Sequence, residues 1–165
     1  MKIIREGDLS RITTVRRFEC PDWMIVLKIR TVLDEGAFLP HRAHPTDAGL
    51  DLFSPIDMIV RAHGSAIFPT GVHVQLPPET DGQIWSKSGM NINSDITTTG
   101  LIDEGYTGMI VVKLFNHGQD DYMVHRGDKI AQLVITPVLY AEPEQVDGPL
   151  PETPRGDNGF GSTGR

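Results

Sequence analysis

Short apolar runs separated by glycine and proline fill most of this sequence, and they constrain its fold more than any other feature. No stretch of about 11 residues shows the apolar spacing of an amphipathic helix. The expected strands are 23–32, 50–53, 57–62, 66–68, 72–76, 83–86, 109–115, 122–124 and 130–139, with a hairpin around 95–103. The expected turns are at 63–64, 71, 77–78, 81–82 and 127–128. This pattern predicts an all-β sandwich or barrel.

Length and changes in composition divide the chain into three parts. At 165 residues the sequence predicts one domain with tails. Residues 1–22 carry mixed charge and form an N-terminal extension to which we assign no role. Residues 23–140 contain the expected strands and form the expected core. Residues 141–165 are rich in proline, glycine and acids, so we expect a mobile C-terminal arm.

The charge of the chain excludes some classes of function. A net charge of −7 argues against binding to nucleic acid, which depends on many lysines and arginines. No apolar run approaches the ~18 residues of a membrane span, and the N-terminus lacks a signal-peptide core. We therefore expect a cytoplasmic protein that does not bind membranes. The single cysteine, Cys20, excludes an internal disulfide and a multi-cysteine zinc site.

The segment 97–118 joins a polar turn to an apolar strand. Asp103 ends a short apolar run, and Tyr106 follows it across a turn that contains Gly105 and Gly108. A carboxylate and an aromatic ring on one rigid turn suit a small ligand, as a proton acceptor and a stacking surface. Taken alone, the stretch is better explained as a hairpin turn with a solvated acid and a core tyrosine.

Two further stretches suit phosphate groups. Lys87, Ser88 and Gly89 place a cation, a hydroxyl and an open backbone N–H side by side, although a turn at a strand end explains them equally. Residues 126–128 are best explained as a β-turn, while Gln132 on the strand that follows could reach a phosphate. No P-loop motif is present.

The last ten residues have the chemistry of an anion-binding loop. Glycines such as Gly161 let backbone N–H groups converge on an anion, and Ser162 and Thr163 add hydroxyl donors. Arg155 offers a two-pronged contact to a terminal phosphate, and Phe160 could cover a flat base. The alternative is a disordered tail.

Five stretches taken together resemble the trimeric dUTPase family, in the family's order. They are 46–52 (TDAGLDL), 86–90 (SKSGM), 97–118 (TTTGLIDEGYTGMIVVKLFNHG), 126–132 (RGDKIAQ) and 155–164 (RGDNGFGSTG). The resemblance covers about residues 38–164. It implies a distorted β-barrel or jelly roll that forms a homotrimer, with shared sites and a flexible C-terminal arm that completes the site of a neighbour.

The resemblance also implies an activity, Mg²⁺-dependent hydrolysis of dUTP to dUMP and pyrophosphate. Such an enzyme limits uracil in DNA and supplies dUMP for thymidylate synthesis. Asp103 would be the general base for water attack on the α-phosphate, and the Tyr106 ring would exclude ribonucleotides. Asp51 would hold the metal through water, or else form a buried ion pair. The implied substrate-binding residues are Lys87, Ser88, Gly89, Thr97, Gly100, Leu101, Ile102, Tyr106, Val111, Gln132, Arg155, Phe160, Gly161, Ser162 and Thr163.

Two departures from the family pattern leave alternatives open. Many members have arginine where this chain has Lys87, and lysine cannot reproduce a planar bidentate contact. Many members also have an asparagine where this chain has Thr97, in a longer hairpin. The alternatives are a related deoxynucleoside triphosphatase with altered base selectivity, a nucleotide-responsive regulatory binding protein of the same fold, and a purely structural β-trimer.

Overall fold

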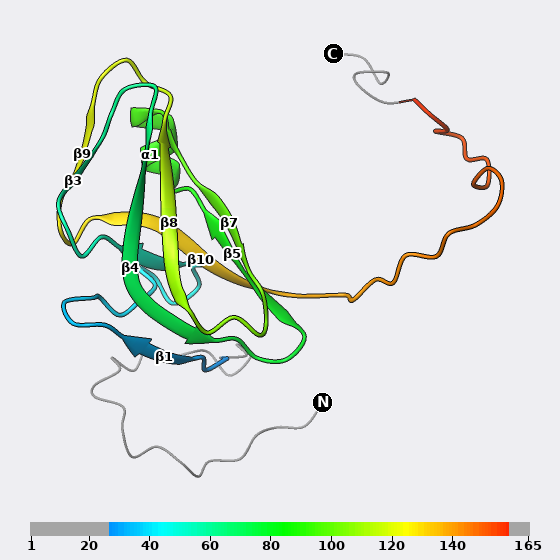
Figure 1. Cartoon of the computed structure of the whole chain (residues 1–165), viewed down its shortest axis with the longest axis horizontal. Coiled ribbons are helices and arrows are strands. Elements are labelled where there is room, and N and C mark those ends of the chain that lie inside the picture. Colours follow the sequence, from blue (N-terminus) through cyan, green and yellow to red (C-terminus); the bar gives the residue numbers. More distant parts are fainter. Residues whose placement is uncertain (1–26, 159–165) are drawn as a thin grey trace, which may run out of the picture.

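The computed structural model describes residues 27–158, most of which form an elongated body of β-strands (Figure 1). The strands are β1 (Arg30–Leu33), β2 (Leu50–Phe53), β3 (Met58–Val60), β4 (Ser65–Gln75), β5 (Thr80–Trp85), β6 (Ile96–Thr97), β7 (Thr99–Ile102), β8 (Met109–Asn116), β9 (Tyr122–Val124) and β10 (Lys129–Pro137). The one helix among the described residues is short, α1 (Ser88–Ser94). The predicted all-β fold is confirmed, and β2 and β9 lie where the sequence placed them.

The strands form two four-stranded sheets and one two-stranded sheet. The first sheet has the order β1-β4-β8-β6, the second β2-β10-β5-β7, and the third pairs β3 with β9. Every strand pair is antiparallel. Sequence neighbours are mostly separated in the sheets, so the chain crosses repeatedly between the two larger sheets, as in a jelly roll.

The core lies between the inner faces of these sheets. Strand β8 shows the pattern most clearly, because its inward residues are buried and alternate with exposed ones. Asn116 is the one polar member of that inward row, and its side chain donates hydrogen bonds to the carbonyls of Val60 and Asp120. The fully buried large apolar side chains are Phe68, Leu52, Ile96, Ile110, Leu114, Ile130, Leu133, Val60, Val72, Val112 and Val124. This packing holds the two large sheets together, which stabilises the fold through burial of apolar surface.

Two predicted turns lie inside strands. Gly71 was expected to separate two strands, but β4 continues through it, with a register shift between Pro69 and His73. Gly71 has a φ of +67°, so it forms a bulge that bends the strand rather than ending it. The turn expected at residues 81–82 is also wrong, because Gly82 is buried in β5 and pairs with Ile102.

The predicted hairpin around residues 95–103 is wrong in its pairing. Strand β6 pairs with β8 in the first sheet, whereas β7 pairs with β5 in the second. The chain changes sheets at Thr98. The strands that β6 and β7 pair with lie outside residues 95–103. The sequence of this segment alone therefore could not predict the pairing.

The two ends of the described chain differ from the body. Of the strand predicted at 23–32, residues 27–29 are not in a strand, and β1 begins at Arg30, which pairs with Gln75, the last residue of β4. Residues 23–26 of the predicted strand lie outside the described residues. Beyond β10 the chain runs away from the body as an extended, exposed segment, residues 141–158 (Figure 1). None of the helices described in residues 27–158 is long and apolar enough to cross a membrane.

Candidate functional site

Asp103 and Tyr106 are held on one tight turn at the end of β7. The Tyr106 backbone N–H donates to the Asp103 carbonyl at 3.0 Å, which closes the turn. The Asp103 side chain is exposed to solvent. The Tyr106 hydroxyl donates to the Met109 carbonyl at 3.0 Å, and the ring lies over Gly108, where an added Cβ would come within 2.5 Å of the hydroxyl oxygen. Tyr106 is therefore a surface ring in a defined orientation, not the core residue of the simpler explanation.

Asp51 is the centre of a second cluster, on β2. Its side chain is only 6 % exposed, and it forms ion pairs with the ammonium groups of Lys87 and Lys129. Lys87 contacts Oδ1, and the Nζ atom of Lys129 lies 2.7 Å from Oδ2. Burial raises the pKa of Asp51, but the hydrogen bonds and positive charges of Lys129 and Lys87 outweigh burial and hold that pKa below its usual value. The buried ion pair that the sequence left open is therefore present, with lysines as partners.

Gln132 lies beside this cluster on β10. It pairs with Asp51 of β2 on one side and with Trp85 of β5 on the other. Its side chain packs over Gly49, where an added Cβ would come within 2.7 Å of the Gln132 amide oxygen. Three of the five motif stretches, 46–52, 86–90 and 126–132, thus contribute to one cationic surface. A fourth, 97–118, carries the turn at the end of β7.

Lys129 is the member of the Asp51 cluster that the sequence did not predict. Strict alternation along β10 would place Lys129 and Gln132 on opposite faces. A register shift between Lys129 and Ala131 adds one residue to β10, so that Lys129 pairs with Phe53 and points to the face that carries Asp51. Nothing in the local sequence marks this bulge.

Lys87 precedes the short helix α1, and Ser88 and Gly89 are its first residues. Lys87 has an extended backbone and is the N-cap residue, while Ser88 and Gly89 are exposed. The ammonium group of Lys87 therefore contacts Asp51 and also lies beside an open surface that an anion could reach. The β-turn expected at Asp128 is confirmed, since its N–H donates to the His125 carbonyl at 3.0 Å.

The turn that carries Asp103 and the cluster of Asp51, Lys87 and Lys129, here called the lysine cluster, lie at opposite ends of β5 within one chain. Ile102, the residue before Asp103, pairs with Gly82, whereas Lys87 follows Trp85 at the other end of the strand. At a rise of about 3.3 Å per residue, the backbones of Asp103 and Lys87 are roughly 15–20 Å apart along the strand. The structure therefore does not bring these two predicted site residues together in one copy of the chain.

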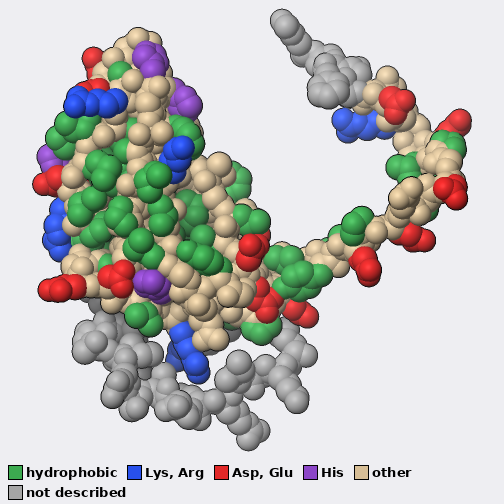
Figure 2. Space-filling model, viewed as in Figure 1, with side chains coloured by type: hydrophobic (Ala, Val, Ile, Leu, Met, Phe, Trp, Pro, Cys, Tyr) green, Lys and Arg blue, Asp and Glu red, His purple; other side chains and the backbone are tan. Residues whose placement is uncertain are grey.

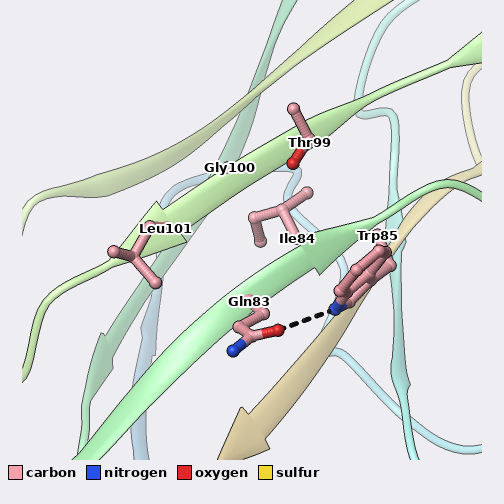
Figure 3. A pocket seen from close by; sticks show the side chains of 6 residues that line it. All are labelled: Gln83, Ile84, Trp85, Thr99, Gly100 and Leu101. Atoms are coloured by element: carbon pink, nitrogen blue, oxygen red, sulfur yellow. Dashed lines mark hydrogen bonds between the residues drawn. The ribbon is translucent and has the colours of Figure 1, made fainter. Parts of the chain in front are cut away.

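A shallow cavity of about 320 Å³ lies over β5 and β7 (Figure 3). It is lined by Gln83, Ile84, Trp85, Thr99, Gly100 and Leu101. Trp85 is 54 % exposed, and its Nε1–H donates to the Gln83 side chain at 3.1 Å. Among the strands of residues 27–158, β7 lies at the edge of its sheet, so alternate backbone groups between Thr99 and Ile102 face outward without a partner in those strands. Such an edge can recognise the hydrogen-bonding groups of a flat ring.

The start of this segment is tied to the lysine motif. The Ser86 hydroxyl donates to the Thr98 carbonyl at 2.9 Å and accepts from the Thr98 N–H at 2.8 Å. Thr97 lies in β6, where its hydroxyl contacts His117 Nε2 at 2.8 Å. The predicted substrate-binding residues of this stretch are thus split, with Thr97 in the first sheet and Gly100, Leu101 and Ile102 in the second.

Other predicted site residues lie apart from both clusters. Val111 is on the outer face of β8 and is 45 % exposed. Arg155 lies in the exposed C-terminal segment, where its Nε–H donates to the Asn158 carbonyl at 3.2 Å. The predictions for Phe160, Gly161, Ser162 and Thr163 lie outside the described residues.

The residues of the site do not fit a metal ion held by the protein. Within residues 27–158, no three His, Cys, Asp or Glu side chains lie together in a group that could bind a metal. Asp51, the predicted metal acid, is one carboxylate facing two ammonium groups, so its surroundings carry a net positive charge. Mg²⁺ prefers carboxylate and phosphate oxygens. This surface favours an anion instead.

Comparison with known proteins shows that this chain is similar to one family over most of its length. The family model described as dUTPase matches residues 35–164. The deoxyuridine 5'-triphosphate nucleotidohydrolase of Clostridium acetobutylicum is 46% identical over 144 residues, which cover 86% of this chain and 98% of that protein. The enzyme of the same name from Gloeothece citriformis is 47% identical over 137 residues, covering 81% of this chain and 94% of that protein.

Solved structures show the same similarity in three dimensions. A dUTPase mutant of Staphylococcus bacteriophage 80alpha with dUpNHpp has a TM-score of 0.78 and 28% identity, and covers 84% of this chain and 99% of its own. A dUTPase mutant from phage phi11 of S. aureus, described with a structural Mg(II) ion, has a TM-score of 0.69 and 29% identity. It covers 74% of this chain and 98% of its own.

Proposed function

The chain belongs to the dUTPase family and is a dUTP nucleotidohydrolase, and from this premise we propose that Asp103 is the general base of the reaction. Its carboxylate is exposed at the end of β7 on a turn closed by the Tyr106 N–H, which is the placement a base needs to accept a proton from water. The activated water attacks the α-phosphorus of dUTP and releases pyrophosphate. The rigid Tyr106 ring beside it packs on the deoxyribose and leaves no room for a 2'-hydroxyl.

The lysine cluster is the proposed triphosphate site. Lys87 and Lys129 concentrate positive charge around one buried carboxylate in a chain of net charge −7. A local cation cluster in an acidic protein focuses its attraction on anions that fit the site. Lys87, Ser88 and Gly89 bind bridging phosphate oxygens, and the Gln132 amide adds a neutral donor. Arg155 and the residues that follow it close over the phosphates as an arm.

The proposed substrate is the Mg²⁺ chelate of dUTP, in which the triphosphate holds the ion. Residues 27–158 offer no cage for the ion, and Asp51 is neutralised by lysines. The residues of the chain bind and orient the chelate through its phosphate oxygens. They hold the reacting phosphorus in line with the water that Asp103 deprotonates.

The uracil ring is proposed to bind at the open edge of β7. Backbone groups of Gly100, Leu101 and Ile102 can copy the pairing edge of a complementary base, because β5 is the only partner of β7 among the described strands. Thr97 lies in β6, so its hydroxyl would act from the neighbouring sheet. Pyrophosphate release from dUTP, dCTP, dTTP and UTP in parallel tests this selectivity directly. Equal turnover of dUTP and dCTP would contradict base recognition at this edge.

The separation of the two clusters supports a site shared between copies of the chain. Asp103 and Lys87 lie at opposite ends of β5, too far apart to serve one α-phosphate. In the proposed homotrimer, Asp103 and Tyr106 of one subunit meet the lysine cluster of a second, and the arm comes from a third. This arrangement is the simplest one that brings all the motifs to one substrate.

An apolar outer face on the first sheet could form the subunit contact. Figure 2 shows hydrophobic side chains gathered over β4 and β8. Ile67 of β4 and Val111 and Phe115 of β8 are 56 %, 45 % and 37 % exposed. Exposed apolar side chains that adjoin one another on a sheet face are typical of surfaces that a partner covers. Val111 would then act on the site through assembly rather than by contact with substrate.

Mixed trimers test the shared site. Asp103→Asn chains lack the base, and Lys87→Met chains lack the phosphate contact, so each is expected to be nearly inactive alone. Refolded together, some interfaces combine the intact base of one chain with the intact lysine of the other. We expect pyrophosphate release to recover to a clear fraction of wild type. Mixed trimers that demonstrably form and show no recovery would place both residues in one subunit's site.

A further inference from the structure

Asp51 has two lysine partners, although one would neutralise it. Its side chain is 6 % exposed, Lys87 is 23 % exposed and Lys129 is 39 % exposed. The two ammonium groups occupy different carboxylate oxygens. The cluster therefore carries one more positive charge than it needs to satisfy the buried acid.

The second lysine removes a conflict in the proposed role of Lys87. A lysine that is the sole partner of a buried carboxylate cannot turn to a phosphate without leaving that carboxylate uncompensated, which is strongly unfavourable. With Lys129 on Oδ2, Asp51 keeps one ion pair when Lys87 leaves Oδ1. The bulge in β10 is what directs Lys129 to this position.

We propose that Lys129 is a positioning residue for dUTP hydrolysis, which keeps the buried Asp51 carboxylate paired and so releases Lys87 to bind the triphosphate. This inference rests on the proposed phosphate role of Lys87. Lys129 itself does not contact the substrate in this scheme. It acts on substrate affinity through Asp51.

The first test is Lys129→Met, assayed by pyrophosphate release from dUTP with Mg²⁺ and by binding of dUpNHpp. With Lys129 gone, Lys87 becomes the only partner of Asp51, so we expect KM and the analogue's Kd to rise about tenfold while kcat changes less than about threefold. Lys129→Arg keeps the cation and should restore KM to within about threefold of wild type. Lys28→Met, the same change at an exposed lysine before β1, is the matched control.

The decisive test repeats Lys129→Met in an Asp51→Asn background. The new side chain in Asp51→Asn carries no charge, so Lys129 has no ion pair to form there and Lys87 needs no help to leave. Lys129→Met should then change KM less than about twofold relative to Asp51→Asn alone. A tenfold loss in both backgrounds would mean that Lys129 binds phosphate directly, which overturns the proposal. No loss in the wild-type background also overturns it, because Lys87 would then be free without help.

The design separates this inference from the proposed function. If Lys87→Met leaves KM unchanged, the phosphate role of Lys87 fails whatever Lys129 does. If Lys87→Met raises KM but Lys129→Met does not, only the role of Lys129 fails. Lys129→Met retains one lysine on Asp51 and is expected to fold. Should it not fold, the comparison in the Asp51→Asn background stands alone, and a KM ratio above about fivefold there overturns the proposal.

Discussion

The Tyr140 hydroxyl donates a hydrogen bond to the Glu104 carboxylate, and so joins the start of the C-terminal segment to the turn that carries Asp103. Glu104 also accepts from the Glu79 N–H at 2.9 Å, and the Glu79 carbonyl accepts from the Val138 N–H at 2.9 Å. Glu79 has a φ of +62°, an uncommon conformation for a residue with a side chain. Three segments thus meet beside the proposed general base.

Removing this junction is expected to slow the reaction. Glu104→Ala loses both hydrogen bonds to the carboxylate, so the Asp103 turn loses an anchor, and we expect kcat to fall about three- to tenfold. Glu104→Gln keeps an acceptor oxygen and should stay within about twofold of wild type. Both are measured by pyrophosphate release, with Glu142→Ala on the exposed segment as the control. A loss in Glu104→Gln equal to that in Glu104→Ala would mean that the charge matters, not the anchor.

The same junction can be followed through Tyr140. The hydrogen bond to Glu104 raises the pKa of Tyr140 above its usual value of 10.0. In Glu104→Ala we expect that pKa to return toward its usual value, which a difference titration of tyrosinate absorbance against wild type would report. An unchanged titration would show that the contact is not kept in solution.

Asp103→Asn is expected to remove the proposed base and leave the binding surfaces intact. General base catalysis contributes about 10²–10⁴-fold to a rate, so we expect kcat to fall by that factor. Binding of dUpNHpp should stay within about tenfold of wild type, because no phosphate contact is changed. A variant that keeps most of its kcat would exclude Asp103 as the base.

Asp51 is expected to make the stability of the fold depend on pH in the acid range. The pKa of Asp51 is lowered in the folded state from a usual value of 3.8, so its ion pairs stabilise the protein fully above that value. The stabilisation is lost as the pH falls through the folded pKa, which lies below 3.8. Asp51→Asn should therefore flatten the pH dependence of the unfolding free energy below about pH 4, as measured by urea denaturation.

Glu104 and Asp121 also contribute to the pH dependence of the unfolding free energy in the acid range. Their pKa values are also lowered, by hydrogen bonds from Tyr140 and from the Ala62 N–H respectively. Neither group is buried, so a smaller acid dependence should remain in Asp51→Asn. An unchanged slope would show that the Asp51 ion pairs do not hold in solution.

Deleting residues 155–165 is expected to impair catalysis without weakening the fold. Residues 141–158 are exposed throughout, so the described part of this segment adds little buried apolar area. The deletion removes Arg155 and the glycine-rich motif, and we expect kcat/KM to fall at least about a hundredfold. The melting temperature should stay near that of wild type. Near-normal kinetics would show that the segment is only a tail.

Chelation of metal by EDTA is expected to abolish pyrophosphate release and leave the melting temperature unchanged. The physical reason is that residues 27–158 hold no group of metal-binding side chains, so folding gains nothing from the ion. Thermal unfolding in EDTA and in Mg²⁺, each without nucleotide, makes the comparison. A melting temperature that rises with Mg²⁺ alone would indicate a metal site on the protein.

The all-β fold and most strand positions could be predicted from the sequence, because they depend on local patterns. Alternation in residues 109–116 and the short apolar runs of β2 and β9 follow from burial of one strand face. Asp103 and Tyr106 were also found as one turn, since four consecutive residues determine its geometry. The family itself was recognisable because its motifs are contiguous stretches.

What the tertiary structure decided depends on contacts between distant residues. Gly71 and Gly82 are typical turn residues, yet they lie inside strands because partner strands continue past them. Thr97 and Gly100 pair in different sheets for the same reason. Lys129 reaches Asp51 only because a bulge reverses its side chain, and the bulge depends on register with β2. Register is set by packing across the whole sheet, so no local stretch of sequence contains it.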